Sequence, residues 1–139
     1  MFGAIIGDFA GSIYEFAQTK KIKQLKIKKI LKKNSFFSDD TICTIAVLDS
    51  ILNKKDYGVT LRQYVKKYEN YSPNFKPYFQ SSFSPNFIKW ANSNEVGKSK
   101  GNGALMRISP VGFLFNDKQT ITEQAKLATM PSHNSEEAI

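Results

Sequence analysis

Two adjacent carboxylates flanked by two hydroxyls are the most chemically suggestive group in this sequence. The run Ser38-Asp39-Asp40-Thr41 follows two phenylalanines and stands where a helix is expected to begin. Carboxylate and hydroxyl oxygens are hard ligands of the kind that Mg²⁺ and Mn²⁺ prefer. The same residues also suit a structural role, because serine is a favoured N-cap and acidic residues in a first helical turn interact favourably with the helix macrodipole. The cluster alone leaves both interpretations open.

A glycine-rich segment at residues 99–104 is the second candidate. Glycines let backbone N–H groups approach an anion, and a helix N-terminus directly after them adds a favourable dipole. The helical pattern that follows contains Arg107, one of two arginines in the chain, which could bind a phosphate or pair with a buried carboxylate. Asn-Gly is also common in tight turns, so the segment alone predicts either a phosphate-binding loop or a simple turn.

Two single residues complete the set of candidates. Glu15 shares one face of a helical pattern with Asp8 and Ser12 and is the candidate carboxylate for proton transfer or substrate orientation. His133 is the sole histidine and precedes an acidic turn near the end of the sequence, where a capping or surface role competes with a functional one. The sequence contains no Cys/His cluster for zinc, no Walker-type loop and no nucleophile elbow.

Helices are the elements expected to position these groups, because strand signals are sparse and no internal repeat is visible. Helical spacing of apolar residues predicts helices over residues 2–17, 39–52, from Thr60, around 87–91, and from Thr120 to 128. Capping boxes, 60–63 and 120–123, are expected to begin the third and the last of these. We therefore expect an all-α fold with residues 1–139 in a single domain.

The predicted first and second helices carry expectations about burial. Gly3, Gly7 and Gly11 would let another backbone or a ligand approach the first helix, which is expected to be buried and near a site. In the second helix Ile42 and Ile45 are expected to be buried, together with Ala46 and Leu48. Residues 20–33 form a basic segment, interpreted as a solvated connector with a membrane-surface helix as the alternative. Residues 71–85 predict a long ordered loop anchored by aromatic side chains, Phe75, Tyr78, Phe79 and Phe83.

Composition narrows the classes of function. The net charge is +8, but it comes almost wholly from lysine, whereas nucleic-acid readers rely on arginine forks. No stretch is long and apolar enough to span a bilayer, and the start lacks the basic region of a signal peptide. We expect a cytoplasmic protein without a membrane or nucleic-acid partner, in which the single cysteine, Cys43, is a small core residue.

The order of the motifs is more informative than any one of them. Gly7-Asp8-Phe9-Ala10-Gly11-Ser12-Ile13-Tyr14-Glu15, then 37–41, then Gly101-Asn102-Gly103-Ala104-Leu105-Met106-Arg107, then His133, resembles the N-terminal half of the ADP-ribosylglycohydrolase family. That family includes the dinitrogenase-reductase-activating glycohydrolases and the ADP-ribosyl-acceptor hydrolases. The resemblance spans nearly the whole chain.

The resemblance implies a compact all-α, multi-helix protein with two divalent ions, Mg²⁺ or Mn²⁺, in an ADP-ribose cleft. Its activity would be hydrolysis of the bond between C1 of the distal ribose and an acceptor, on an ADP-ribosylated protein or small molecule. By similarity the metal ligands would be Ser38, Asp39 and Asp40, and the catalytic carboxylates Glu15, Asp39 and Asp40. The substrate-binding residues would be Ser99, Gly101, Asn102, Gly103, Ala104, Arg107 and His133.

One departure from the family pattern changes the expectation. Family members carry a second Asp-x-Asp-Ser/Thr cluster towards the C-terminus, and no residues after Asp40 match it, since Asp49, Asp56 and Asp117 are isolated. We therefore expect a bundle truncated at its C-terminus, inactive alone, for which a separate chain could supply the missing half. The alternatives are a non-catalytic ADP-ribose-binding or interaction protein and a basic nucleic-acid-binding domain.

Overall fold

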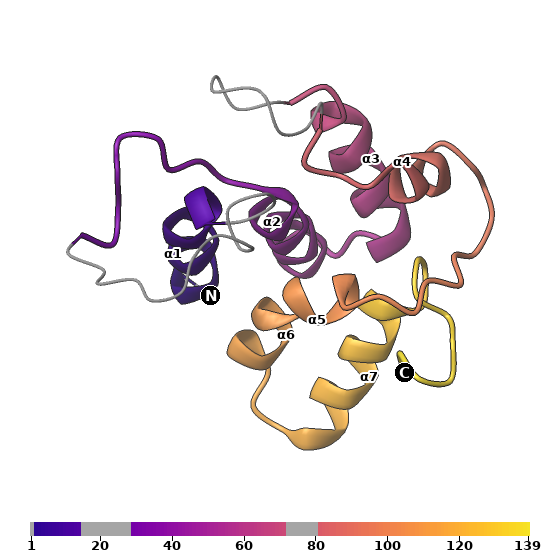
Figure 1. Ribbon diagram of the computed structural model, residues 1–139. Coiled ribbons are helices and arrows are strands. Elements are labelled where there is room, and N and C mark those ends of the chain that lie inside the picture. Colours follow the sequence, from indigo (N-terminus) through magenta and orange to yellow (C-terminus); the bar gives the residue numbers. More distant parts are fainter. Residues whose placement is uncertain (1, 15–28, 72–80) are drawn as a thin grey trace.

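A computed structural model describes residues 2–14, 29–71 and 81–139, and the helices in these ranges make up the fold (Figure 1). In chain order they are α1 Phe2–Gly11, the 3₁₀ turn η1 Ser12–Tyr14, α2 Asp39–Leu52, α3 Tyr57–Tyr68, α4 Pro85–Ala91, α5 Gly103–Met106, α6 Ser109–Leu114 and α7 Lys118–Thr129. No strand occurs in the described ranges, where one antiparallel bridge pairs Lys98 with His133. The all-α prediction is confirmed.

Helix α2 lies at the centre of the fold and contacts α1, α3, α5 and α6 (Figure 1). Its buried face supplies Ile42, Ala46 and Val47 to the core, where they meet Leu61 and Val65 of α3. These apolar side chains recur every three or four residues, so one face of each helix leaves water on packing. The predictions that α2 spans 39–52 and that Cys43 is a core residue are both confirmed.

The predicted starts of α3 and α7 are wrong by a few residues, and for the same reason. An aspartate upstream of each expected capping box provides the N-cap instead: the Asp56 side chain accepts from Val59 N at 2.8 Å, and Asp117 from Thr120 N at 2.8 Å. Helix α3 therefore begins at Tyr57 rather than Thr60, and α7 at Lys118 rather than Thr120. An aspartate caps a helix as well as a threonine does, so the first suitable cap along the chain sets the start.

The helix predicted around residues 87–91 also needs correction at its start. Helix α4 begins at Pro85, because the Ser84 side chain accepts from Phe87 N and proline suits the first helical position. The acidic residues at the end of the chain form a turn, in which Ala138 N donates to Ser135 O at 3.1 Å.

The expectation that α1 is a buried apolar helix is wrong for its first two turns. Phe2 and Ile6 are 72% and 52% exposed, whereas Asp8 and Ser12 are buried. The polar face turns inward because hydrogen bonds attach it to the start of α2. A methyl group added at any of the three α1 glycines would meet no atom of the described residues, so none of the described backbone approaches there. In α2, Ile45 is 37% exposed and its predicted burial is also wrong.

Several predictions fall on residues outside the described ranges. They concern Glu15, the basic segment up to residue 28, and the aromatic residues Phe75, Tyr78 and Phe79. Phe83, the described member of that aromatic set, is 3% exposed and joins the core as expected. Among the described helices, none combines the length and apolarity that crossing a bilayer requires.

Candidate functional site

Asp8 of α1 organises the acidic cluster at the start of α2. Its carboxylate accepts hydrogen bonds from Ser38 N at 2.8 Å and Ser38 Oγ at 2.6 Å. It also accepts from Thr41 N at 3.2 Å and from Thr41 Oγ1 at 2.5 Å. Asp8 is 9% exposed, so a buried carboxylate is offset by four donors and by the positive end of the α2 macrodipole.

The hydroxyls of Ser38 and Thr41 both donate to Asp8 and therefore have a structural role. The carboxylates of Asp39 and Asp40 lie between them in the first turn of α2. Ser38 is fully buried, and its hydroxyl donates to Asp8 while accepting from Asp40 N at 3.3 Å. The N-cap interpretation of Ser38 is therefore confirmed. Burial raises the pKa of Asp40, and the negative charge of Asp8 raises it further.

The donor set at this point fits a divalent cation in part. Asp39 and Asp40 present half-buried carboxylate oxygens, and a cation would relieve the repulsion between Asp40 and Asp8. The Ser38 oxygen retains one lone pair, with its proton held by a carboxylate as in the outer shell of many metal sites. Within the described residues, however, no three acidic, histidine or cysteine side chains lie together as a complete metal-binding group.

A pairing of two segments brings the glycine-rich loop to His133. Gly97 N donates to Pro131 O at 2.9 Å, Ser99 N to Ser132 O at 3.2 Å, and Asn134 N to Gly97 O at 2.9 Å. Gly97 is required for this approach, because a Cβ there would lie 2.7 Å from the Ser132 Cα. Residues 33 to 37 positions apart in sequence thus become neighbours through backbone contacts that side-chain patterns do not reveal.

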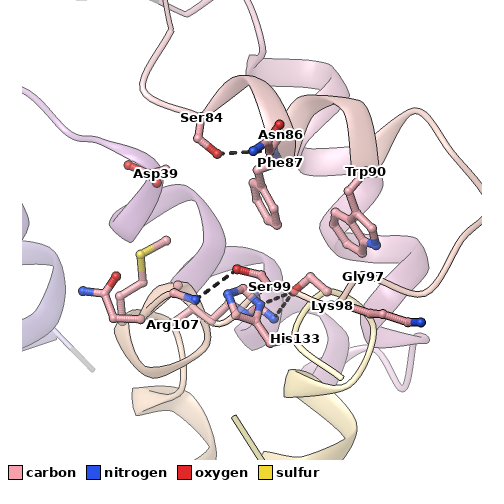
Figure 2. A pocket seen from close by; sticks show the side chains of 15 residues that line it. Asp39, Ser84, Asn86, Phe87, Trp90, Gly97, Lys98, Ser99, Arg107 and His133 are labelled. Carbon is pink, nitrogen blue, oxygen red and sulfur yellow. Dashed lines mark hydrogen bonds between the residues drawn. The ribbon is translucent and has the colours of Figure 1, made fainter. Parts of the chain in front are cut away.

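The paired segments form one wall of a pocket of about 490 Å³, and α4 forms another (Figure 2). Phe87 and Trp90 extend from α4 towards the loop, with stacked rings whose centroids are 5.1 Å apart. The Arg62 guanidinium lies 4.3 Å from the centroid of the Trp90 ring, and the indole Nε1 donates to Pro131 O at 2.8 Å. These two contacts hold the Trp90 ring in its position at the pocket. A pocket of this volume, with aromatic and polar walls, is typical of a small-molecule site.

Seven of the predicted site residues meet in this pocket. They are Asp39, Ser99, Gly101, Asn102, Gly103, Arg107 and His133. Ser38, Asp40 and Ala104 lie next to pocket residues in the chain but do not line it, and Glu15 is outside the described ranges. The structure therefore places the start of α2, the glycine-rich loop and the histidine around one space.

The glycine-rich loop differs in detail from the expected phosphate-binding geometry. The Ser99 hydroxyl accepts from Gly101 N at 3.2 Å, which makes a tight turn of the loop. Asn102 precedes α5 without a side-chain cap, and α5 has only four residues, so its dipole is small. Gly101 and Asn102 are exposed, and because the Gly101 N–H is bonded to Ser99, the amide groups of Asn102, rather than a helix dipole, are what the loop offers an anion.

Arg107 and His133 are both buried at the floor of the pocket. Arg107 is fully buried and pairs with no carboxylate of the described residues; its Nη2 donates to Ala128 O and Ser132 Oγ. His133 is 3% exposed, and its Cε1 and Nε2 atoms would lie 3.2 Å from a Cβ on Gly103. Burial, and next the positive charge of Arg107, lower the pKa of His133 to about 4. The imidazole is neutral near neutral pH.

Sequence reasoning missed four residues that shape the site: Asp8, Gly97, Phe87 and Ser132. Asp8 shares a predicted helix face with Ser12 and Glu15, but helical spacing does not show that this polar face is buried. The remaining three gave no signal of their own, because their roles depend on the pairing of residues 97–99 with 131–134 and on the position of α4.

Comparison with known protein families identifies the family of the chain. The model of the ADP-ribosylglycohydrolase family matches residues 1–139, and the chain belongs to that family. This is a family of glycohydrolase-type enzymes. The resemblance that the ordered motifs indicated is confirmed. No solved structure gives a significant match to the chain.

Proposed function

We propose that the pocket binds ADP-ribose and that the chain takes part in hydrolysing the bond between C1 of the distal ribose and an acceptor. The observation that supports this most is the meeting of Asp39, the glycine-rich loop and His133 around one pocket of about 490 Å³. ADP-ribose carries a diphosphate, two ribose rings and a purine. The amide groups of the exposed Asn102 suit the diphosphate, and the Phe87 ring offers a flat apolar face to a ring system.

In this proposal the acidic cluster faces the reacting end of the ligand. Asp39 and Asp40, with Ser38 beside them, would hold Mg²⁺ or Mn²⁺, and a bound ion of this kind orients ribose hydroxyls and lowers the pKa of water. Asp8 keeps the two carboxylates in place by fixing the first turn of α2. Glu15, seven residues after Asp8 in the same motif, is proposed as the carboxylate that assists proton transfer.

Catalysis would require oxygen ligands beyond these, since cation dehydration is offset only by a nearly complete charged ligand set. We propose that a separate chain supplies them and docks near α1. In support, Phe2 and Ile6 expose large apolar side chains on the helix that carries Asp8. A protein partner covering them would remove apolar surface from water and bring its ligands close to the acidic cluster.

One observation favours a second candidate, a non-catalytic ADP-ribose-binding protein. The described residues contain no group of three metal-ligating side chains, whereas the pocket wall is well formed. Such a protein would bind ADP-ribose and release nothing from ADP-ribosylated arginine or serine peptides. The hydrolase would release ADP-ribose from at least one acceptor class when Mg²⁺ is present and the missing ligands are supplied.

Calorimetric titration with ADP-ribose tests the binding function that both candidates share. Asn102→Ala alters the loop at the pocket, and Asn116→Ala is a matched control on an exposed residue that does not line it. We expect saturable binding by the wild type, a loss of about five- to tenfold in affinity for Asn102→Ala through one lost hydrogen bond from the Asn102 side-chain amide to the ligand, and no change for Asn116→Ala. The proposal would be rejected if neither ADP-ribose nor AMP, which is part of it, gave any heat of binding at millimolar concentration.

A further inference from the structure

Three buried groups at the floor of the pocket form a continuous hydrogen-bonded chain. Arg107 Nη2 donates to Ser132 Oγ at 2.8 Å, and Ser132 Oγ lies 2.7 Å from His133 Nδ1. The other proton of Arg107 Nη2 is directed to Ala128 O at 2.9 Å, which fixes the plane of the guanidinium. All three side chains are at most 3% exposed, so water does not compete for these contacts.

The direction of the protons along this chain follows from the chemistry of its first member. A guanidinium has five N–H donors and no acceptor, so Ser132 Oγ must accept from Arg107. The serine hydroxyl then directs its own proton to His133 Nδ1, its remaining hydrogen-bond neighbour within the described part of the chain. Nδ1 therefore acts as an acceptor, and the single proton of the neutral ring resides on Nε2.

The protonated nitrogen lies on the pocket side of the ring. Cε1 and Nε2 lie against the backbone of Gly103, and His133 lines the pocket beside the glycine-rich loop. Burial, and next the positive charge of Arg107, oppose a second proton on the ring and lower the pKa of His133. A neutral Nε2–H donor in a pocket that Asn102 also lines favours an oxygen acceptor in the ligand.

We propose that Arg107 and Ser132 are positioning residues that hold His133 as the neutral Nε2–H tautomer, a fixed hydrogen-bond donor for a phosphate or ribose oxygen in the pocket. The identity of that acceptor rests on the proposed function, whereas the tautomer does not. A consequence is that His133 acts as a donor to the ligand and not as a general base. Proton transfer in the reaction then falls to the carboxylates.

The sole histidine of the chain makes this testable by NMR without ambiguity. In ¹⁵N-labelled protein near neutral pH, long-range proton–nitrogen correlation should show a pyrrole-like Nε2 and a pyridine-like Nδ1. Ser132→Ala should produce a tautomer mixture and raise the ring pKa, while Ser132→Thr, which keeps the hydroxyl, should restore the wild-type pattern. Ser50→Ala is the matched control, because Ser50 is another serine 2% exposed, whose hydroxyl donates to Ala46 O.

The wild-type spectrum alone can overturn the inference, whether or not any variant folds. A ring protonated on Nδ1, or on both nitrogens near neutral pH, would contradict it, as would a folded Ser132→Ala protein with an unchanged tautomer. Addition of ADP-ribose separates this inference from the proposed function. A shift of the Nε2 resonance supports both; an unmoved resonance in a ring with the expected tautomer supports the positioning role and counts against ADP-ribose as the ligand.

Discussion

Replacing Asp8 by alanine tests whether this carboxylate holds α1 to the start of α2. The substitution removes the acceptor for Ser38 N and Thr41 N, two backbone donors in a buried position, together with two hydroxyl contacts. An unsatisfied buried donor costs about 1–3 kcal/mol, so the two amides together predict a loss of about 2–6 kcal/mol in the free energy of unfolding. That is a large part of the roughly 5–15 kcal/mol that stabilises a typical domain.

Urea unfolding followed by circular dichroism measures this loss, provided that the slope of free energy against denaturant is unchanged. Asp56→Ala is the matched control, because Asp56 is an exposed N-cap whose side chain accepts a single backbone hydrogen bond. Removing such a cap costs about 1 kcal/mol. Asp8→Asn keeps one neutral acceptor oxygen and should fall between the wild type and Asp8→Ala.

The reasoning would be refuted by an Asp8→Ala protein no less stable than Asp56→Ala. That result would mean that water or another side chain satisfies the two amides once the carboxylate is gone. The role of Asp8 in fixing the acidic cluster would then lose its physical basis.

Three further predictions follow from the pocket and the core. Gly97→Ala should lower the thermal midpoint markedly, because its Cβ would overlap the backbone of Ser132; Gly112→Ala, whose Cβ would meet no atom of the described residues, is the control in the same thermal scan. Stability should fall as pH drops from 6.5 towards 4, since over that range the unfolded state protonates His133 and the folded state does not; this part of the pH slope should vanish in His133→Gln, measured by denaturation at each pH. Burial raises the pKa of the Cys43 thiol to about 12, so a thiol reagent should label native protein at the rate of global unfolding and denatured protein at once; fast labelling of native protein would show that the core is open.

A helix could be predicted from sequence where a single residue was suited to be its N-cap and one of its faces was apolar. Helix α2 met both conditions, with Ser38 as its cap and Ile42, Ala46 and Val47 on its buried face. Helix starts at α3 and α7 were misplaced because two acceptable caps lay a few residues apart. Periodicity identified the helix at α1 but not which side of it is buried, since that depends on four hydrogen bonds to residues thirty positions away.

The members of the candidate site could be predicted from their order along the chain, and their arrangement could not. The glycine-rich loop and His133 were named separately, whereas their contact results from the Lys98–His133 bridge and from the absence of a side chain at Gly97. Arg107 was expected to bind a phosphate or a carboxylate, and its observed partners are a carbonyl and Ser132. A hydrogen-bond partner that is common and small, such as serine, gives no sequence signal.

The central claim is that the pocket binds ADP-ribose, and the sole tryptophan of the chain tests it most directly. Trp90 lines the pocket and stacks on Phe87, so a ligand in the pocket should change its fluorescence. Titration with ADP-ribose, corrected for absorption, should change the emission along a saturable curve in the wild type and in Asn116→Ala, with the midpoint shifted to higher concentration in Asn102→Ala. An emission that does not saturate, or a curve that Asn102→Ala leaves unchanged, would contradict the claim.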